Sequence, residues 1–183
     1  MIAQSESSKC FMWFKRVLHI IAVVTALPLL NACSQDKTDP FIGYSADYIY
    51  AVGHDALQNG KWSTALEAYQ SLDSQYPFNT YTQKGDLDSI YANYRNNDSA
   101  LALTEAARYI KVYSTDTIGV AYAYYMMGVV NFDNGRGFLQ RYLPYQMAQH
   151  NAANYTTAYN DFNTVVTSYP NSPYASDSRR RMI

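Results

Sequence analysis

The sequence predicts an all-α fold in which pairs of antiparallel helices repeat along the chain, and three observations lead to this prediction. Hydrophobic residues recur at intervals of three and four, the period of a helix, whereas no stretch alternates with the two-residue period of a strand. Residue types return at fixed intervals in successive segments. With 48% hydrophobic residues, the chain has enough apolar side chains to form a core.

The repeat is defined by four positions per unit. A small residue is followed by a second small residue 12 positions later, an aromatic residue 4 further on, and a proline 8 beyond that. The positions are Gly53, Ala65, Tyr69 and Pro77 in the first unit; Ile90, Ala102, Ala106 and Ser114 in the second; and Gly128, Ala158, Phe162 and Pro170 in the third, where an insertion follows Gly128. The second unit keeps the intervals but departs from the residue types, with Ile90 in place of the glycine and Ser114 in place of the proline. We expect each small residue to lie where two helices cross closely, and the proline to end the second helix.

The first unit shows the helical period most clearly. Ile49, Gly53 and Ala56 share one face of a first helix, and Ala65 and Leu72 share one face of a second. The turn between them is residues 59–60, Asn-Gly, which could also close a β-hairpin. Because its flanks repeat at three and four residues, we favour the helical interpretation.

These intervals and residue types are typical of tetratricopeptide repeats, helix-turn-helix units of 34 residues that stack into a superhelix. We expect repeats at residues 45–79, 80–116 and 117–172, the last with an inserted loop at 133–150, and the start of a truncated fourth repeat at 173–183.

The first 32 residues are predicted to be a signal peptide. Lys15 and Arg16 precede a run of largely apolar residues at 17–30. A membrane-spanning helix needs about 20 apolar residues, so this run is too short to span a bilayer comfortably. We therefore expect it to direct export and to be removed.

Residues 30–33, Leu-Asn-Ala-Cys, span the end of the signal peptide and the cysteine that follows it, and they resemble the lipobox of bacterial lipoproteins. That resemblance implies that Cys33 becomes the new N-terminus and carries diacylglycerol and N-acyl lipid. Ser34 is not an acidic retention signal, which by the same resemblance indicates the outer membrane, on its periplasmic side. Residues 33–44 would then be the lipidated cysteine and a tether. An ordinary secretory peptide that happens to contain a cysteine is the alternative.

Composition argues against several classes of function. The 14 basic and 15 acidic residues leave a net charge of -1, so no basic surface indicates nucleic acid as a partner. The only cysteines are Cys10 and Cys33, which excludes a disulfide framework and a CxxC zinc site. Asp86 and Asp88, two positions apart, cannot share one helix face as a metal site. With no catalytic constellation, we expect a non-enzyme that needs no cofactor or metal.

Several strings of residues together resemble the BamD family, over roughly residues 46–183. They are ALQNGKW at 56–62, SLDSQYPFNTY at 71–81, LDSIYANYRN at 87–96 and SYPNSPY at 168–174. The family comprises repeat-containing lipoproteins of the machinery that inserts β-barrel proteins into bacterial outer membranes. Its members carry about five repeats, so the resemblance implies that this chain is a truncated form.

The resemblance implies a binding role. The first helix of each unit would line a groove that receives unfolded outer-membrane proteins and passes them to the barrel insertase, with membrane contact only through the lipid anchor. The candidate groove residues are Tyr50, Leu87, Tyr91, Tyr94, Arg95, Tyr122, Tyr125 and Phe132. Arg95 could pair with a terminal carboxylate. The opposing interpretation is that these rings only pack against neighbouring helices.

Two further expectations concern partners. The loop at 133–150 carries Phe138, Tyr142 and Tyr145, which we expect to contact another lipoprotein subunit of the same machinery. The alternative function is a lipid-anchored scaffold for cell-envelope constriction or peptidoglycan synthesis. That role predicts folded protein partners and no affinity for barrel proteins.

Overall fold

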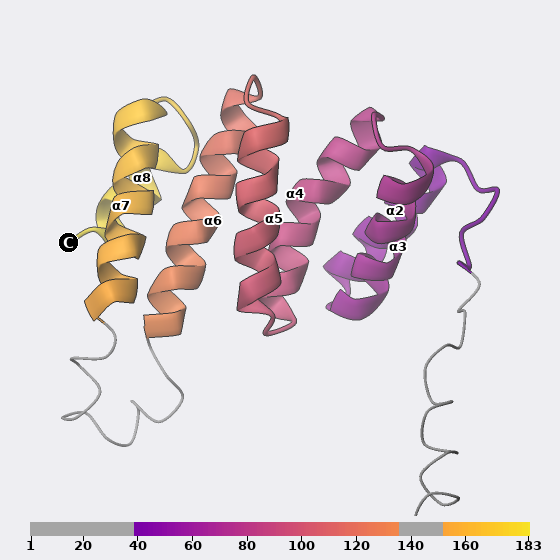
Figure 1. Ribbon diagram of the computed structural model, residues 1–183, viewed down its shortest axis with the longest axis horizontal. Coiled ribbons are helices and arrows are strands. Elements are labelled where there is room, and N and C mark those ends of the chain that lie inside the picture. The colour runs from indigo at the N-terminus through magenta and orange to yellow at the C-terminus, as the bar shows by residue number, and fades with distance from the viewer. Residues whose placement is uncertain (1–38, 136–151) are drawn as a thin grey trace, which may run out of the picture. The chain divides into compact units, whose positions relative to one another are not determined.

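A computed structural model describes residues 39–135 and 152–183, and all of its regular structure is α-helical (Figure 1). Within these two ranges no strand occurs, so the all-α prediction is confirmed. The helices are α2 (Ala46–Gln58), α3 (Trp62–Gln75), α4 (Thr80–Arg95), α5 (Ser99–Val112), α6 (Thr117–Gly135), α7 (Ala152–Ser168) and α8 (Ala175–Arg181).

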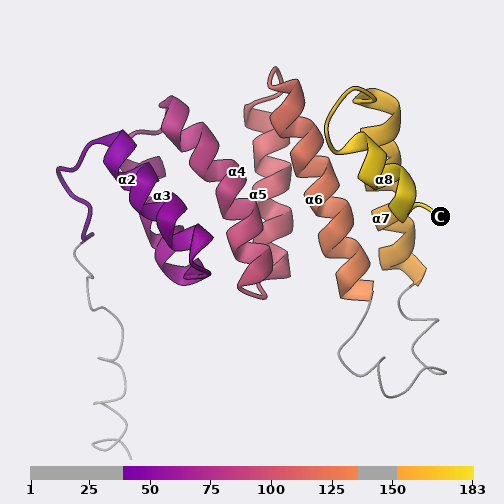
Figure 2. The same cartoon turned by 180° about the vertical axis from the view of Figure 1, so that it is seen from behind.

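The helices form two layers. Each helix packs against the next along the chain, and α4 also packs against both α2 and α6. Figure 2 shows α4, α6 and α8 in front, whereas α5 and α7 are in front in Figure 1. This alternation of first and second helices is the packing of tetratricopeptide-like repeats.

Short turns join the helices, and their residues explain where each helix ends. Gly60 has φ +71°, a left-handed conformation that favours glycine, and it directly follows the C-cap of α2. The Asn-Gly turn therefore connects two helices, and the hairpin alternative is wrong. Asn79 and Asp98 are the N-caps of α4 and α5, their side chains accepting hydrogen bonds from the backbone N–H groups of Tyr81 and Leu101.

The repeated small residues lie where the paired helices approach most closely. A Cβ atom added at Gly53 would lie 2.6 Å from the Tyr69 ring, and one at Gly128 would lie 2.6 Å from the Phe162 ring. Both contacts are too short for real atoms, so only glycine permits these crossings. The predicted close crossing in the first and third units is therefore confirmed.

In the second unit the large and the small residue of the helix crossing change places. Ile90 stands where the other units have glycine, and Ala106 stands where they have an aromatic ring. Both side chains are fully buried in one cluster with Tyr109, Ala123 and Met126. A large residue on the first helix is thus matched by a small one on the second, which keeps the interior filled. This cluster is the core between α4, α5 and α6.

The structure corrects the start of the predicted insertion. Helix α6 runs to Gly135, so residues 133–135 are helical and not part of a loop. Asp133 accepts a hydrogen bond from the Tyr94 hydroxyl at 2.5 Å, which ties this last turn to α4. The remaining loop candidates Phe138, Tyr142 and Tyr145 lie outside the described residues, as do the signal peptide and Cys33.

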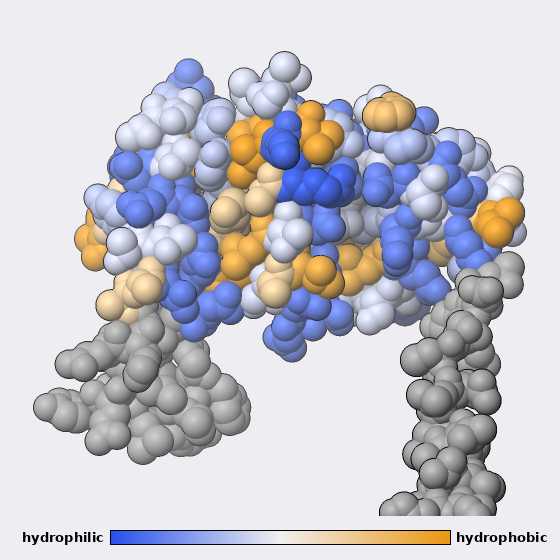
Figure 3. Space-filling model, viewed as in Figure 1, coloured by the Kyte–Doolittle hydropathy of each residue, from blue (hydrophilic) through white to orange (hydrophobic). Residues whose placement is uncertain are grey.

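None of the described helices combines the length and the apolar character that crossing a bilayer requires. The face formed by α3, α5 and α7 is largely hydrophilic, with hydrophobic residues gathered over α5 (Figure 3). Leu101 and Val112 are the exposed large hydrophobic residues of that helix.

Candidate functional site

The layer of α2, α4 and α6 carries the predicted groove residues, and nearly all of them are half-buried. Their rings and aliphatic groups pack against the helices while one edge remains accessible; Arg95 alone is exposed. The half-buried members are Tyr50, Leu87, Tyr91, Tyr94, Tyr122, Tyr125 and Phe132. Both interpretations of these rings therefore have support, since each ring helps to pack the fold and also presents surface.

The structure brings five of these residues together. They pack over the core cluster between α4, α5 and α6, from two adjacent helices of the same layer. The five are Leu87, Tyr91, Tyr94, Tyr122 and Tyr125. Tyr50 instead packs on the core of the first helix pair. Phe132 packs on that of the third, which Tyr94 and Tyr125 also contact. The face thus has one aromatic centre, which continues to Phe132 through a shared cluster and has Tyr50 on its other flank.

Arg95 is held in place by aromatic rings. Its guanidinium carbon lies 4.7 Å from the centre of the Trp62 ring, and its Nη1 donates a hydrogen bond of 2.6 Å to the Tyr91 hydroxyl. The Trp62 and Tyr91 rings meet edge to face at 5.9 Å. Within residues 39–135 and 152–183, Arg95 forms no ion pair with a carboxylate. The charge is therefore oriented and available to an anionic group.

Asp88 joins three helices on the flank beside Tyr50. Its Oδ2 accepts hydrogen bonds from the Tyr50 hydroxyl at 3.2 Å and the Tyr69 hydroxyl at 3.0 Å, and lies 3.0 Å from His54 Nδ1. Burial, and then the Asp88 charge, raise the pKa of Tyr50 to about 12 and that of Tyr69 further. Both hydroxyls are therefore protonated donors at neutral pH.

The His54 ring completes this cluster. Because an ionised Asp88 only accepts, we assign the proton to Nδ1, which leaves Nε2 to accept from the Gln58 side-chain amide at 3.0 Å. Tyr50 also stacks on His54, with 5.5 Å between ring centres. A shallow hollow of about 720 Å³ opens here and extends to Tyr81 at the start of α4.

On the other side of the centre, α6 meets α8. The rings of Tyr122 and Tyr125 lie 5.2 Å and 5.4 Å from that of Tyr174, and the Tyr125 hydroxyl donates to Asp177 at 2.8 Å. Burial is the main reason that the pKa of Tyr122 is raised. These contacts continue the aromatic surface from α4 to the end of the described chain.

Three important residues escaped the sequence analysis. Trp62 opens α3 and so lies in a second helix, whereas the predicted groove consists of first-helix residues; its place after the Asn-Gly turn is the available signal. The sequence pattern excludes Asp88 as a metal ligand but indicates no other role for it. Tyr174 precedes a helix whose register the repeat pattern does not fix. Their roles depend on contacts between helices, which no spacing within one helix reveals.

This face combines three kinds of chemical group. It offers aromatic rings, protonated tyrosine hydroxyls and one oriented guanidinium, which suit an extended apolar peptide that carries a carboxylate. Among the residues that the structure describes, no group of three or more His, Cys, Asp or Glu side chains could hold a metal ion. Stacked helix pairs with such a face define a tetratricopeptide-like repeat protein.

Comparison with known families makes the assignment more specific. The sequence model of the YfiO family, described as outer membrane lipoproteins, matches residues 44–183. Several similar proteins are named outer membrane protein assembly factor BamD. The chain therefore belongs to the BamD (YfiO) family of outer membrane lipoproteins, and the resemblance drawn from the sequence is confirmed.

The similarity extends over most of the chain but not over the whole of its relatives. The BamD of Vibrio cholerae is 35% identical over 157 residues, which are 86% of this chain and 64% of that protein. The corresponding proteins of Xylella fastidiosa and Haemophilus influenzae are each 29% identical, covering 90% and 91% of this chain but 57% and 63% of their own lengths. The chain thus spans about six tenths of the curated relatives that it matches.

Proposed function

We propose that this chain is a lipid-anchored, periplasm-facing component of an outer-membrane protein assembly complex, and that it binds unfolded β-barrel proteins without catalysing a reaction. Membership of the BamD family supports the general role, since the relatives are named as assembly factors. In this proposal Cys33 carries the lipid, and the partners are the barrel insertase and its other lipoprotein subunits. No cofactor is required.

The observation that carries the binding role is the oriented Arg95 on the aromatic face. An extended peptide whose last residue is aromatic has an apolar ring and a free carboxylate a few ångströms apart. Tyr91 and Tyr94 offer rings for the former, and Arg95 offers for the latter a guanidinium that has no ion pair with a carboxylate among the described residues. Because Trp62 and Tyr91 already restrict the Arg95 side chain, little rotamer entropy is lost on binding.

The test compares two peptides and two variants. A fluorescent peptide of alternating apolar residues that ends in phenylalanine is titrated with the full chain in detergent micelles, once with a free carboxylate and once amidated. Arg95→Gln should weaken binding of the free-carboxylate peptide roughly tenfold, the effect of losing one charge-assisted hydrogen bond. It should change the affinity for the amidated peptide little.

Arg179→Gln is the matched control, because Arg179 is also an exposed arginine but lies on α8, away from Trp62 and Tyr91. It should leave both affinities unchanged. If the parent chain bound both peptides with equal affinity, Arg95 would have no role in binding the peptide carboxylate. No binding of either peptide would contradict the proposed function itself.

A measurement in cells distinguishes the assembly role from the scaffold alternative. A photoreactive residue in place of Tyr91 should crosslink to outer-membrane barrel proteins during their synthesis, or to their insertase. Adducts confined to division or wall-synthesis proteins would instead support the scaffold role.

A further inference from the structure

The segments that connect the helices differ between the two edges of the row. Because each helix runs opposite to the one before it, the start of α2 and the α3–α4, α5–α6 and α7–α8 turns lie at the same edge, at the top of Figures 1 and 2. We call it the upper edge. Its connecting segments are residues 39–45, 76–79, 113–116 and 169–174. Each contains at least one phenylalanine or tyrosine, and the only charged residues among them are Asp39 and Asp116.

Both of these carboxylates are bound within the protein. Asp39 accepts hydrogen bonds from the Ser71 hydroxyl at 2.7 Å and from the Gln75 side-chain amide at 3.1 Å. Asp116 accepts from the Tyr109 hydroxyl at 2.7 Å. The two charges therefore stabilise the fold, and every other residue of the four segments is uncharged.

Large hydrophobic residues at the upper edge are exposed to solvent. Phe78 is fully exposed in the α3–α4 turn, and Ile42 is 66% exposed ahead of α2. The other exposed residues are Tyr44 and Tyr48 at the start of α2, and Val112 and Ile118 on either side of the α5–α6 turn. Exposed apolar side chains that gather in this way mark a contact with a membrane or with another protein.

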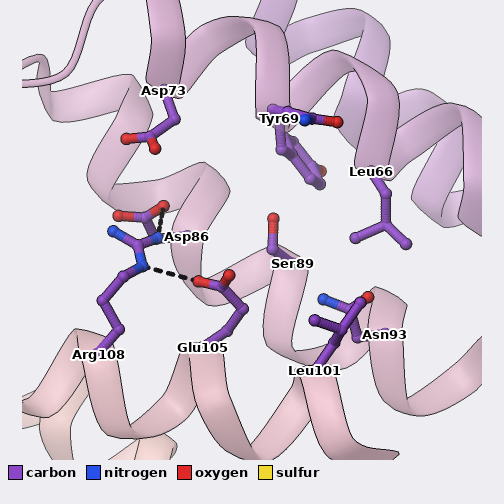
Figure 4. Close-up of a pocket in the computed structure, with 10 residues that line it drawn as sticks. Leu66, Tyr69, Asp73, Asp86, Ser89, Asn93, Leu101, Glu105 and Arg108 are labelled. Atoms are coloured by element: carbon purple, nitrogen blue, oxygen red, sulfur yellow. Dashed lines mark hydrogen bonds and ion pairs between the residues drawn. The ribbon is translucent and has the colours of Figure 1, made fainter. Parts of the chain in front are cut away.

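The turns at the opposite edge carry charge, as do the flanks of the helices. Lys61 lies in the α2–α3 turn and Asp98 in the α4–α5 turn. In a pocket between α3, α4 and α5, the Arg108 guanidinium donates to Asp86 at 2.6 Å and to Glu105 at 2.8 Å (Figure 4). The low charge is therefore a property of the upper edge and not of the whole surface.

The chain that follows Cys33 enters the domain at this same edge. Asp39, where the described residues begin, is hydrogen-bonded to Ser71 and Gln75 near the end of α3, and α3 ends at the upper edge. Six residue steps separate Cys33 from Asp39. At about 3.6 Å per residue, their Cα atoms are at most about 22 Å apart. The lipid proposed at Cys33 would therefore keep the upper edge close to the bilayer.

We propose that the upper edge lies on the periplasmic lipid surface of the outer membrane, with Ile42, Phe78 and Ile118 at the boundary between headgroups and acyl chains. Aromatic and aliphatic side chains are typical of that boundary, where a tyrosine ring reaches the apolar region while its hydroxyl stays in water. The inference rests on the proposed lipid at Cys33, and it adds a second membrane contact to the anchor.

The test uses the isotope-labelled chain, lipidated in bacterial cells and reconstituted into nanodiscs of phosphatidylethanolamine and phosphatidylglycerol. A lipid with a nitroxide on its headgroup broadens the backbone amide signals of residues close to the bilayer surface. Ile42, Phe78 and Ile118 should lose at least twice as much signal as Leu101, an exposed hydrophobic residue at the opposite edge.

Two other outcomes would overturn the proposal, and they can be told apart. Equal loss at all four residues in an anchored chain would mean that the upper edge faces water or a protein partner, and the proposed function would stand. A chain that does not remain with the nanodiscs would contradict the lipid at Cys33 and, with it, the contact of the edge.

A pair of variants tests the exposed apolar side chains. The double variant Ile42→Ser and Phe78→Ser removes side chains that are largely exposed, so the fold should be preserved. The signal loss at the Tyr44 amide should fall at least twofold. Leu101→Ser is the matched control and should leave that loss unchanged. An unchanged loss in the double variant, or an equal decrease in the control, would overturn the contact.

The lipid charge separates an apolar contact from an electrostatic one. The helix turns that adjoin the upper edge carry both signs, with Asp47 in the first turn of α2 and Lys111 in the last turn of α5. The signal loss should therefore be the same in nanodiscs without phosphatidylglycerol. A contact that requires the anionic lipid would overturn the role of the apolar side chains.

Discussion

At the scale of single residues, the fold depends on which side of each helix crossing carries the bulk. Gly128 permits the Phe162 ring to lie against the backbone of α6, and Gly53 does the same for Tyr69 on α2. In the second unit the large residue, Ile90, lies on the first helix, and the small one, Ala106, lies on the second. Residues that face each other at a crossing are therefore coupled, although they lie far apart in sequence. A change in the size of one of them alters the packing of the other.

Gly128→Ala should lower the free energy of unfolding by about 1–3 kcal/mol, because the new methyl group would overlap the buried Phe162 ring. Urea unfolding followed by circular dichroism measures this. Gly85→Ala is the control: its Cβ would lie 3.1 Å from the Tyr69 ring, a contact that a small shift relieves, while alanine favours the helix by about 1 kcal/mol. Equal destabilisation by both variants would contradict the crossing argument.

The buried Asp161 gives a pH-dependent prediction. It is 9% exposed, and burial raises its pKa, while a 2.8 Å hydrogen bond from Asn131 opposes this only in part. A raised pKa in the folded state means that ionisation above that pKa destabilises the fold. Asp161→Asn should therefore unfold at a higher urea concentration than the parent chain at pH 7.

This advantage of Asp161→Asn should disappear near pH 3, where Asp161 is protonated in both the folded and the unfolded chain. Asparagine can still accept the bond from Asn131, so packing is preserved. Asp55→Asn, at an exposed position of α2, serves as the control and should show no difference between the two pH values. An advantage that persists unchanged at pH 3 would show that the charge is not its cause.

At the scale of the helices, stability depends on how each one begins. Asp98 caps α5, its side chain accepting from the Leu101 N–H at 3.0 Å, whereas Lys61 precedes α3 without a side-chain bond of this kind. The first backbone N–H groups of a helix have no hydrogen-bond partner within the helix. A capping side chain stabilises the helix because it accepts a hydrogen bond from one of these groups, which only water would otherwise solvate.

Asp98→Ala should lower the free energy of unfolding by about 1 kcal/mol, the usual effect of losing a cap. Lys61→Ala changes the same position of α3 but removes no capping bond, and it should have little effect. Thermal unfolding of the two variants side by side provides the measurement. A loss of equal size at Lys61 would assign the effect to something other than capping.

At the scale of the whole molecule, the helix pairs form a row in which each contacts only its neighbours. Asp88 is the point where α2, α3 and α4 meet, since Tyr50, Tyr69 and His54 all reach one carboxylate oxygen. Linear arrays of this kind unfold locally when a single junction is weakened. The Asp88 junction therefore controls how firmly the first helix pair is attached.

Asp88→Ala should speed hydrogen exchange in α2 and α3 while leaving α6 and α7 protected, because it removes the acceptor that joins the first pair to α4. Hydrogen exchange read by mass spectrometry resolves these segments. Asp55→Ala removes an exposed carboxylate from α2 and should change no segment beyond its own turn. Uniform acceleration across all helices would show global destabilisation and contradict a local junction.

The sequence by itself determined the helical class, the repeating pair and the close crossings at Gly53 and Gly128. These features can be predicted because periodicity and residue size are properties of each segment and do not depend on how that segment packs. It also indicated Tyr91, Tyr94 and Arg95 as candidates, since they lie on one helix. The end of α6 was misplaced by three residues because the insertion has no repeat partner to align with.

Only the tertiary structure decided which side chains from different helices meet. The stacking of Arg95 on Trp62, the convergence on Asp88 and the ion pair of Asp86 with Arg108 each join residues from two or three helices. Spacing within one helix fixes a face but not the partner opposite that face, because the partner depends on how the helices pack in three dimensions. The surfaces available for binding are therefore properties of the assembled layers.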